Sequence, residues 1–203
     1  VLFRSVFNIS APPMLVQYPA AAAACAILEL ARKQEADAAA WSRLLQSPFL
    51  DGGQSEYHFR AVVDAALREQ GDFLVSVSRV AFLARSLAGS GGPSVLSDLL
   101  QGMQNQARGL PDSNAPDQWA KIFVQILDAA GWPGQRSLTS AEYQSVTAFR
   151  QALERFAKLY PAAGNLSFAR ARQIFVSMLH QIPFAPEQPE APVQILGLLE
   201  AGG

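Results

Sequence analysis

The fold is decided by residues 7–50, FNISAPPMLVQYPAAAAACAILELARKQEADAAAWSRLLQSPFL, in which a short β-type segment gives way to alanine-rich helices. The β-type segment, residues 6–10, is followed by two prolines that stop it. Alanine has the highest intrinsic helix propensity, so the alanine row after Pro19 predicts a helix that continues to about Ala36. A second helix is predicted over residues 36–46 and ends where a proline and two glycines follow.

Helical apolar spacing continues through most of the remaining chain. Apolar residues recur at i, i+3, i+4 and i+7 in further segments that are separated by polar or glycine-rich joints. The stripes predicted to face a core lie in residues 59–67, 73–84, 95–103, 119–130, 143–156 and 168–179. Thr139 and Glu142 fit a T-x-x-E capping box, which predicts a helix start at this point. The sequence therefore predicts a mainly α fold.

A second β-type segment follows the helices, in the final run PVQILGLLEAGG, residues 192–203. Two short strands at opposite ends of a helical chain do not form an independently stable sheet, because fewer than three strands leave unpaired edges. We therefore expect both strands to pair with strands that this chain lacks, as parts of an incomplete α/β domain.

Composition and charge narrow the class of protein. Half of the 203 residues are hydrophobic and 16% are charged, and no apolar run approaches the roughly 18 residues that a membrane helix needs. We expect a globular protein without membrane partners, and a cytoplasmic one because no secretion signal begins the chain. The 16 basic and 17 acidic residues give a net charge of −1, so any contact with DNA has to be local.

Motifs for chemistry are absent from the sequence. No G-x-x-x-x-G-K-[ST] phosphate loop and no G-x-S-x-G nucleophile elbow is present. The two histidines, His58 and His180, lack partners at metal-ligand spacing, and the single cysteine, Cys25, lies in an alanine-rich run typical of buried filler. We therefore predict no catalytic residue, no metal site and no cofactor in this chain.

A few residues are candidates for contact with DNA. Arginines suit phosphate, and an exposed aromatic ring can stack on a base. Trp41 and Trp119 lie on apolar stripes and are predicted to be core residues, whereas Trp132 lies in the turn GWPG. The candidates are Arg43, Arg136, Arg170, Arg172 and Trp132. The alternative is that most of these arginines belong to solvated helix faces.

The order of these pieces resembles a region of UvrD/RecB-like superfamily 1 helicases. In that family a short strand, a small loop, a proline-led helix, a polar turn and a helix ending in LL-x-SP occur where the second RecA-like domain gives way to an inserted helical 2B subdomain. The resemblance implies that residues 6–55 are the edge of the RecA-like 2A domain. It also implies that residues 56–190 are a 2B-like insertion and that residues 191–203 are a truncated return strand.

The final run resembles the helicase motif V-x-V-x-T-x-H-x-A-K-G-L-E-F. Val193 and Ile195 stand at the two valines, Ala201 at the alanine and Gly203 at the glycine. Three positions depart from the motif: Gly197 replaces the threonine, Leu199 the histidine and Gly202 the lysine. Leucine and glycine have no side-chain hydrogen-bonding groups, so the resemblance implies a degenerate motor.

The pattern is most similar to AddB/RexB-type recombination proteins and to bacterial probable DNA repair proteins with a downstream PD-(D/E)XK nuclease domain. It implies a non-catalytic fragment of a double-strand-break repair protein that contacts single-stranded or forked DNA and positions it for the nuclease. The Mg²⁺ would belong to that nuclease domain. Other implied partners are the remaining domains of the same chain and a helicase-nuclease subunit.

The alternative to this DNA-contacting role is a helical protein-protein interaction scaffold without DNA contact. Salt-dependent DNA binding separates the two.

Residues 1–5, VLFRS, are set apart from the rest. One of their possible back-translations is the end of a common sequencing adapter, so we expect these five residues not to be native protein. The alternative is an ordinary N-terminal strand start.

Overall fold

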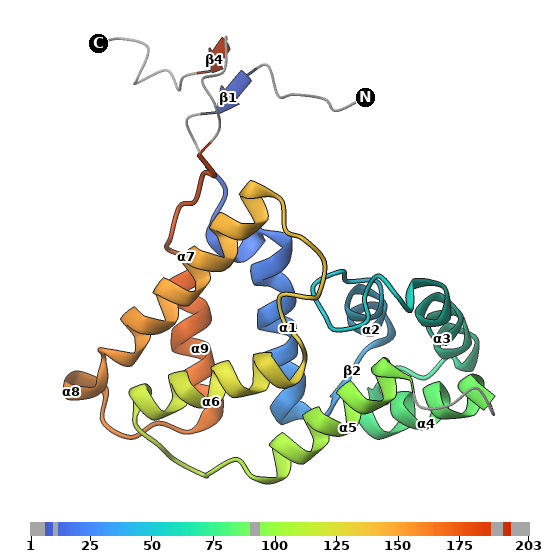
Figure 1. Ribbon diagram of the computed structural model, residues 1–203. Helices are drawn as coiled ribbons and strands as arrows, with labels where there is room; N and C mark the ends of the chain where they lie inside the picture. The colour runs from blue at the N-terminus through green and yellow to red at the C-terminus, as the bar shows by residue number, and fades with distance from the viewer. Residues whose placement is uncertain (1–6, 10–11, 90–93, 188–192, 196–203) are drawn as a thin grey trace.

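The computed structural model describes residues 7–9, 12–89, 94–187 and 193–195, and within them the chain is mainly α-helical, as the sequence predicts (Figure 1). The helices are α1 (Pro19–Lys33), α2 (Ala38–Leu45), α3 (Tyr57–Gln70), α4 (Val77–Ala88), α5 (Val95–Arg108), α6 (Pro116–Ala129), α7 (Ser140–Ala157), α8 (Tyr160–Ala163) and α9 (Phe168–Leu179). The strands are β1 (Phe7–Ile9), β2 (Glu35–Ala36), β3 (Val75–Ser76) and β4 (Val193–Ile195), and a 3₁₀ turn, η1 (Leu15–Gln17), precedes α1. None of the helices described here combines the length and apolar character needed to cross a membrane.

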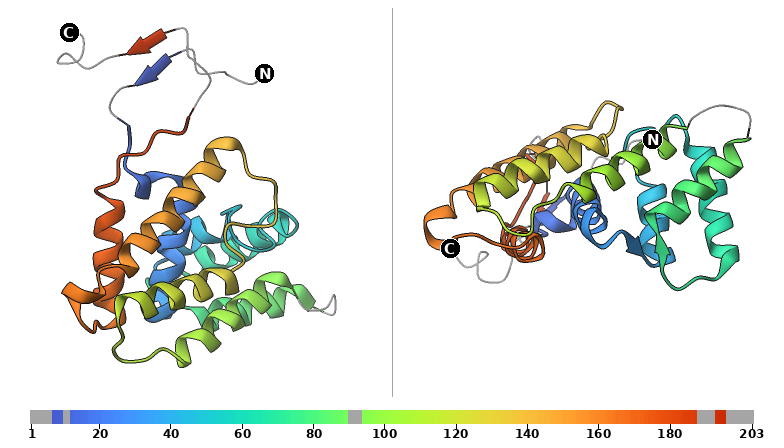
Figure 2. Two further views of the ribbon diagram at one scale, coloured as in Figure 1. Left: turned by 60° about the vertical axis from the view of Figure 1, so that its left-hand side comes forward. Right: turned by 90° about the horizontal axis from the view of Figure 1, so that it is seen from below.

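Helix α1 runs through the centre of the helical body (Figures 1 and 2). It contacts α2, α5, α6, α7 and α9, and most of its buried residues are alanines, whose small side chains let neighbouring helices approach closely. The helix ends earlier than predicted. Gln34 has a left-handed conformation with φ 57°, and its side-chain amide donates to the carbonyl oxygens of Leu30 and Ala31. Residues 35–36 then form a strand, so the predicted end at Ala36 is wrong.

The other helices lie in two groups on either side of α1 (Figure 1). Helices α6, α7 and α9 enclose a cluster of buried aromatic rings, with neighbouring ring centroids 5.2 to 6.2 Å apart. The rings belong to Trp119, Phe123, Phe149, Phe156, Phe168 and Phe175. Edge-to-face and offset pairs of this kind stabilise a core beyond the area that they bury. Helices α2 to α5 form the second group, with Trp41 buried as predicted.

The predicted stripe over residues 73–84 does not begin in a helix. Phe73 and Leu74 precede strand β3, which pairs with β2, and α4 begins only after Ser76. The Ser76 hydroxyl accepts a hydrogen bond from the backbone N–H of Arg79 and so caps the helix. Phe73 is 85% exposed, so the prediction that it faces the core is wrong.

Helix α7 begins as the capping box predicts. The Thr139 hydroxyl accepts from the Glu142 backbone N–H, and the Glu142 carboxylate accepts from the Thr139 backbone N–H. The predicted stripe of this helix holds except at its start. Tyr143 is 64% exposed, because the buried side of α7 begins at Ser145.

Strands β1 and β4 pair with one another, in parallel and in register from Phe7 opposite Val193 to Ile9 opposite Ile195. Both strands were expected to pair with strands outside this chain, so their mutual pairing is a correction. The pair lies apart from the helical body, at the end where α1 begins (Figures 1 and 2). The entire helical body therefore forms the crossover between two adjacent parallel strands.

A neck joins the strands to the helical body. The Leu15 backbone N–H donates to the Ile182 carbonyl oxygen at 2.8 Å, and the Phe184 backbone N–H donates to the Pro13 carbonyl oxygen at 3.0 Å. The Tyr18 hydroxyl donates to the Phe184 carbonyl oxygen at 2.8 Å, and the two rings meet edge to face. The segments that lead into and out of the helices are thus held side by side.

Candidate docking groove between α6 and α7

The groove is positioned by two helices whose inner faces are fully buried. Helix α6 begins at a proline, which suits the first turn because its missing N–H is not needed there. Trp119 and Phe123 of α6 and Phe149 of α7 point into the aromatic core and are completely buried. The outer sides of the same two helices face solvent and form the groove.

The turn between the helices is tied to α1 through Trp132. Its indole nitrogen donates a hydrogen bond to the Ala20 carbonyl oxygen at 2.8 Å, and its ring lies 5.1 Å from that of Phe149. Trp132 is only 5% exposed. It therefore closes one end of the groove as part of the wall.

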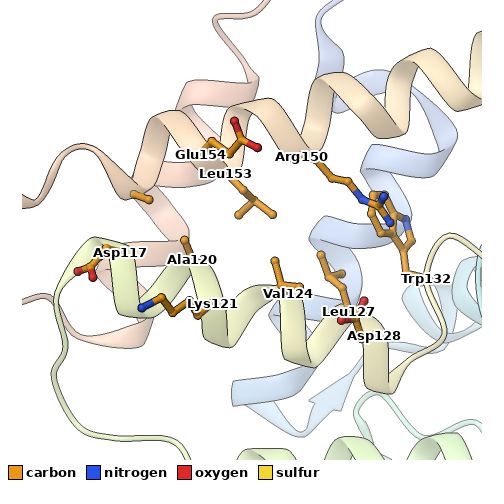
Figure 3. A pocket seen from close by; sticks show the side chains of 11 residues that line it. Asp117, Ala120, Lys121, Val124, Leu127, Asp128, Trp132, Arg150, Leu153 and Glu154 are labelled. Atoms are coloured by element: carbon orange, nitrogen blue, oxygen red, sulfur yellow. The ribbon is translucent and has the colours of Figure 1, made fainter.

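The groove has a volume of about 500 Å³ and an apolar floor (Figure 3). Val124 is 42% exposed, although it is a branched apolar side chain. Val124 of α6 and Leu153 of α7 point toward one another across the groove (Figure 3). The apolar lining consists of Ala120, Val124, Leu127, Trp132, Leu153 and Ala157. Among these residues Val124 is exposed and Ala157 is half-buried, whereas Leu127, Trp132 and Leu153 are only 2–5% exposed, so the floor is a shallow apolar depression in which the Val124 side chain faces solvent.

Charged side chains line the rim of the groove: Asp117, Lys121, Asp128, Arg150 and Glu154. None of these five makes an ion pair within the part of the chain that the structure describes. The Arg150 guanidinium lies over the Trp132 ring, 6.0 Å from its centroid. This geometry is a cation-π contact, which holds Arg150 at one end of the groove (Figure 3).

Trp132 was predicted to be an exposed aromatic residue that could stack on a base. The prediction of exposure is wrong, because the Ala20 carbonyl and the Phe149 ring enclose the indole from distant parts of the chain. A tryptophan buried in this way cannot offer a ring face to a base without leaving its site. The turn itself lies where it was predicted.

Arg136 makes contacts within the protein, with Glu142 and with Phe49. Its guanidinium donates two hydrogen bonds to the Glu142 carboxylate, at 3.0 and 2.5 Å, and lies 5.2 Å from the centroid of the Phe49 ring. The hydrogen bonds from Arg136 lower the pKa of the Glu142 carboxyl to about 2. Arg136 thus ties the turn before α7 to the segment after α2.

The other three arginines proposed for DNA lie on two elements, α2 and α9. Arg43 is exposed on α2 and borders a shallow hollow with Gln46 and Arg68. Arg170 is exposed on α9 and donates to Gln173, whereas Arg172 lies 3.7 Å from the Glu29 carboxylate of α1. The candidate arginines thus come from three parts of the fold: α2, the turn before α7 and α9.

The helicase-like motif falls largely outside the described residues. Val193 and Ile195 lie in β4, at the two positions that pair with Phe7 and Ile9. Gly197, Leu199, Ala201, Gly202 and Gly203, and likewise residues 1–5, are outside the part of the chain that the structure describes.

Candidate metal ligands do not cluster in the described part of the chain. No group of three or more His, Cys, Asp or Glu residues there could hold a metal ion. Burial raises the pKa of the Cys25 thiol to about 12, which keeps the sulfur protonated at neutral pH.

Sequence reasoning missed the groove, although a signal for it exists. In α6, Ala120 and Val124 extend the apolar arc beyond the stripe formed by Trp119, Phe123 and Ile126. A helix that packs on one side only needs an apolar arc of roughly 100°. The wider arc of α6 indicates a second apolar face, and this is the face that forms the groove.

No known protein family, curated protein or solved structure was found to match this chain.

Proposed function

We propose that this chain is a non-catalytic helical docking module and that its α6–α7 groove binds an amphipathic helix of a partner protein. The groove itself is the observation that carries the proposal. Its floor leaves Val124 nearly half exposed in the wild-type chain, although burying a valine contributes about 1.5 kcal/mol or more. A partner that covers this floor would gain the part of that free energy that corresponds to the exposed fraction of Val124.

The shape of the groove favours a helix as its occupant. Its lining on α6 extends from Asp117 to Asp128, which corresponds to about 16 Å along a helix axis. Three turns of an amphipathic helix fit that length and would place apolar residues at i, i+3 or i+4, and i+7 over the floor. A drug-sized ligand would need a few buried polar groups to fix its orientation, whereas the charges of this groove lie at its rim.

The positions of the charged groups favour binding over catalysis. Catalytic acids and bases usually have pKa values shifted by burial or by a close charge. The rim residues Lys121, Asp128, Arg150 and Glu154 are exposed, where water screens their charges. We therefore assign this segment a binding role and no reaction of its own.

The pairing of β1 with β4 supports the view that the helical body is an insertion in an α/β domain. Parallel strands occur almost only in buried sheets of several strands, so a pair of three-residue strands fits a larger sheet. The 2A and 2B domains of superfamily 1 helicases have this arrangement, and the chain resembles that region. We propose that the parent is a degenerate helicase-like DNA repair protein, with any Mg²⁺-dependent nuclease in another domain and a helicase-nuclease subunit as a candidate partner.

Contact with DNA is the second candidate function, and one surface favours it. The hollow beside Arg43 and Arg68 continues along α2 and α3 to the exposed ring of Phe73. Two arginines and one exposed aromatic ring suit a single strand, although Asp37 and Asp72 also line the surface. Fluorescence anisotropy with single-stranded and forked DNA at low salt tests this candidate. Loss of binding in Arg43→Glu, with unchanged binding in Arg170→Glu, supports it, and absence of binding at low salt rejects it.

Photo-crosslinking in cells tests the docking function. A photoreactive amino acid is placed at position 124 in the groove and, as a matched control, at position 62, because Val62 of α3 is exposed outside the groove. We expect position 124 to give a discrete adduct whose peptide maps to one amphipathic helix, and position 62 to give none. Equal labelling at the two positions, or no adduct at position 124, would reject the docking function.

A further inference from the structure

The rim of the groove carries more negative than positive side chains, and these side chains make none of the ion pairs described. Three carboxylates, of Asp117, Asp128 and Glu154, face two cations, of Lys121 and Arg150. The formal charge of the rim is therefore −1. None of the three carboxylates forms an ion pair with a described residue, and Asp117 only accepts a hydrogen bond from its neighbour Gln118.

One of the two cations, Arg150, already contacts an aromatic ring. Arg150 lies over the Trp132 ring, at the end of the groove where α6 leads into the turn (Figure 3). This contact orients the Arg150 guanidinium toward the ring and leaves its charge of +1 in place. Asp128 and Glu154 lie on opposite sides of the groove, so a carboxylate borders the floor on each side, next to Lys121 on α6 and Arg150 on α7.

This arrangement disfavours anionic occupants. A nucleic acid would bring phosphates against three carboxylates and only two cations, and an excess of like charge at an interface is unfavourable. A helix with acidic residues beside its apolar stripe meets the same repulsion. A helix with lysines or arginines on both sides of its apolar stripe would pair with Asp128 and Glu154 while its apolar residues cover Val124.

We infer that the partner helix is a basic amphipathic one, with an apolar stripe of about three anchor residues and cationic residues on both sides of it. This inference rests on the docking function proposed above and specifies its ligand. Burial of Val124 and the rim ion pairs, at about 0.2–1 kcal/mol each, both contribute to the affinity. The rim charges also determine which helices bind and how fast they associate.

Three labelled model peptides test the inference on the full chain. Each has about 14 residues, an alanine-rich helical background and leucines at i, i+3 and i+7, and they differ only in having Lys, Gln or Glu beside the stripe. We expect fluorescence anisotropy to show the Lys peptide binding about tenfold more tightly than the Gln peptide, which is 1.4 kcal/mol. The Glu peptide is expected to bind more weakly than either. The preference for Lys is expected to shrink as salt is raised.

Two groove variants and two matched controls test the basic partner helix and the docking function separately. The triple variant Asp117→Asn, Asp128→Asn, Glu154→Gln changes the formal charge of the rim from −1 to +2 and is expected to bind the Glu peptide more tightly than the Lys peptide. Val124→Arg is expected to bind none of the three. The control for the rim is the triple variant Glu69→Gln, Asp72→Asn, Asp112→Asn, and the control for the floor is Val62→Arg. The four residues are exposed outside the groove, and both controls are expected to behave like the wild-type chain.

Each of the other possible outcomes would contradict the basic partner helix, the docking groove or both. Equal binding of the Lys and Gln peptides, lost in Val124→Arg, would overturn the basic partner and retain the docking groove. Binding that persists in Val124→Arg, or binding of no peptide, would overturn both. Concentration-dependent dimerisation that Val124→Arg abolishes would make a second copy of this chain the occupant and would overturn the basic partner helix.

Discussion

The indole nitrogen of Trp132 donates a hydrogen bond to the carbonyl oxygen of Ala20, which lies 112 positions earlier in the chain. This contact fastens the turn between α6 and α7 to the start of the central helix α1. It also closes one end of the groove, so the groove and the core share a residue. Changes at this position therefore affect the stability of the body and the shape of the binding surface together.

We predict that Trp132→Ala lowers the free energy of unfolding by about 3–5 kcal/mol, because a large buried ring is removed. Trp132→Phe keeps much of the ring but loses the hydrogen bond to Ala20, so we expect a loss of about 1–2 kcal/mol. Urea denaturation followed by circular dichroism measures both. Tyr143→Ala, at an exposed aromatic residue of α7, is the control and should change stability by less than about 0.5 kcal/mol. Equal effects at the two positions would mean that Trp132 is not buried.

The ion pair between Arg136 and Glu142 makes stability depend on pH. Hydrogen bonds from Arg136 lower the pKa of Glu142 from 4.5 to about 2 in the folded chain. The folded state therefore favours the ionised carboxylate, and this contribution is complete above the unfolded pKa. It is lost as the pH falls from about 4.5 to about 2.

We predict that Glu142→Gln costs on the order of 2 kcal/mol at pH 7 and progressively less below pH 4.5. Denaturation midpoints of the variant and the wild-type chain, measured from pH 7 to pH 2.5, give the difference at each pH. Glu69→Gln is the control, since Glu69 is exposed on α3 and makes none of the ion pairs described. A constant difference across this range would contradict the assignment to a shifted carboxyl.

The parts of the fold that were predictable depend on local signals. The start of α7 was predictable because Thr139 and Glu142 cap the helix through contacts only three residues apart. The buried side of α6 was predictable because Trp119 and Phe123 repeat at helical spacing. Such signals need no knowledge of what lies across the core.

The features that were not predictable depend on contacts between distant segments. Pairing of β1 with β4 joins residues at opposite ends of the chain, and the burial of Trp132 depends on Ala20 and Phe149. A turn with glycines and a proline is normally exposed, so local reasoning placed Trp132 at the surface. The groove was only partly predictable: the wide apolar arc of α6 indicates a second apolar face, but the opposite wall comes from α7.

Arg60 is a buried cation with incomplete pairing. It is 1% exposed, one terminal nitrogen donates to the Asp51 carbonyl oxygen, and Nε lies 3.8 Å from the Glu56 carboxylate. Nε and Nη1 have no hydrogen-bond partner in the described structure, and burial lowers the pKa of the guanidinium. Leu30, Leu44 and several other apolar side chains surround it. The buried aliphatic stem of Arg60 therefore stabilises the fold, whereas its incompletely paired charge destabilises it.

We predict that Arg60→Met stays within about 1 kcal/mol of the wild-type chain, because it fills the same apolar space without an unpaired buried charge. Arg60→Ala leaves a cavity, and we expect a loss of about 3–5 kcal/mol. Urea denaturation compares the two variants, with Arg155→Met on the exposed side of α7 as the control. If Arg60→Met were as destabilising as Arg60→Ala, the charge rather than the volume would be the required feature.

Gly131 and Gly71 form a natural pair for testing how the turn before α7 is held. Both have a positive φ, 64° and 68°, so an alanine at either position carries a conformational penalty of roughly 1–2 kcal/mol. They differ in their surroundings. A Cβ at Gly131 would clash with the Cβ of Asp51, whereas a Cβ at Gly71 would meet nothing within 4 Å.

We predict that Gly131→Ala costs about 1–3 kcal/mol more than Gly71→Ala, because the turn must move away from the segment that contains Asp51. The displacement would also shift Trp132, so Gly131→Ala should weaken binding of the Lys peptide to the groove while Gly71→Ala, at the end of α3, leaves it unchanged. Urea denaturation and peptide anisotropy measure the two effects on the same samples. Equal stability of the two variants would show that the turn is not clamped against residues 48–51, and Trp132 would then lose its fixed position at the end of the groove.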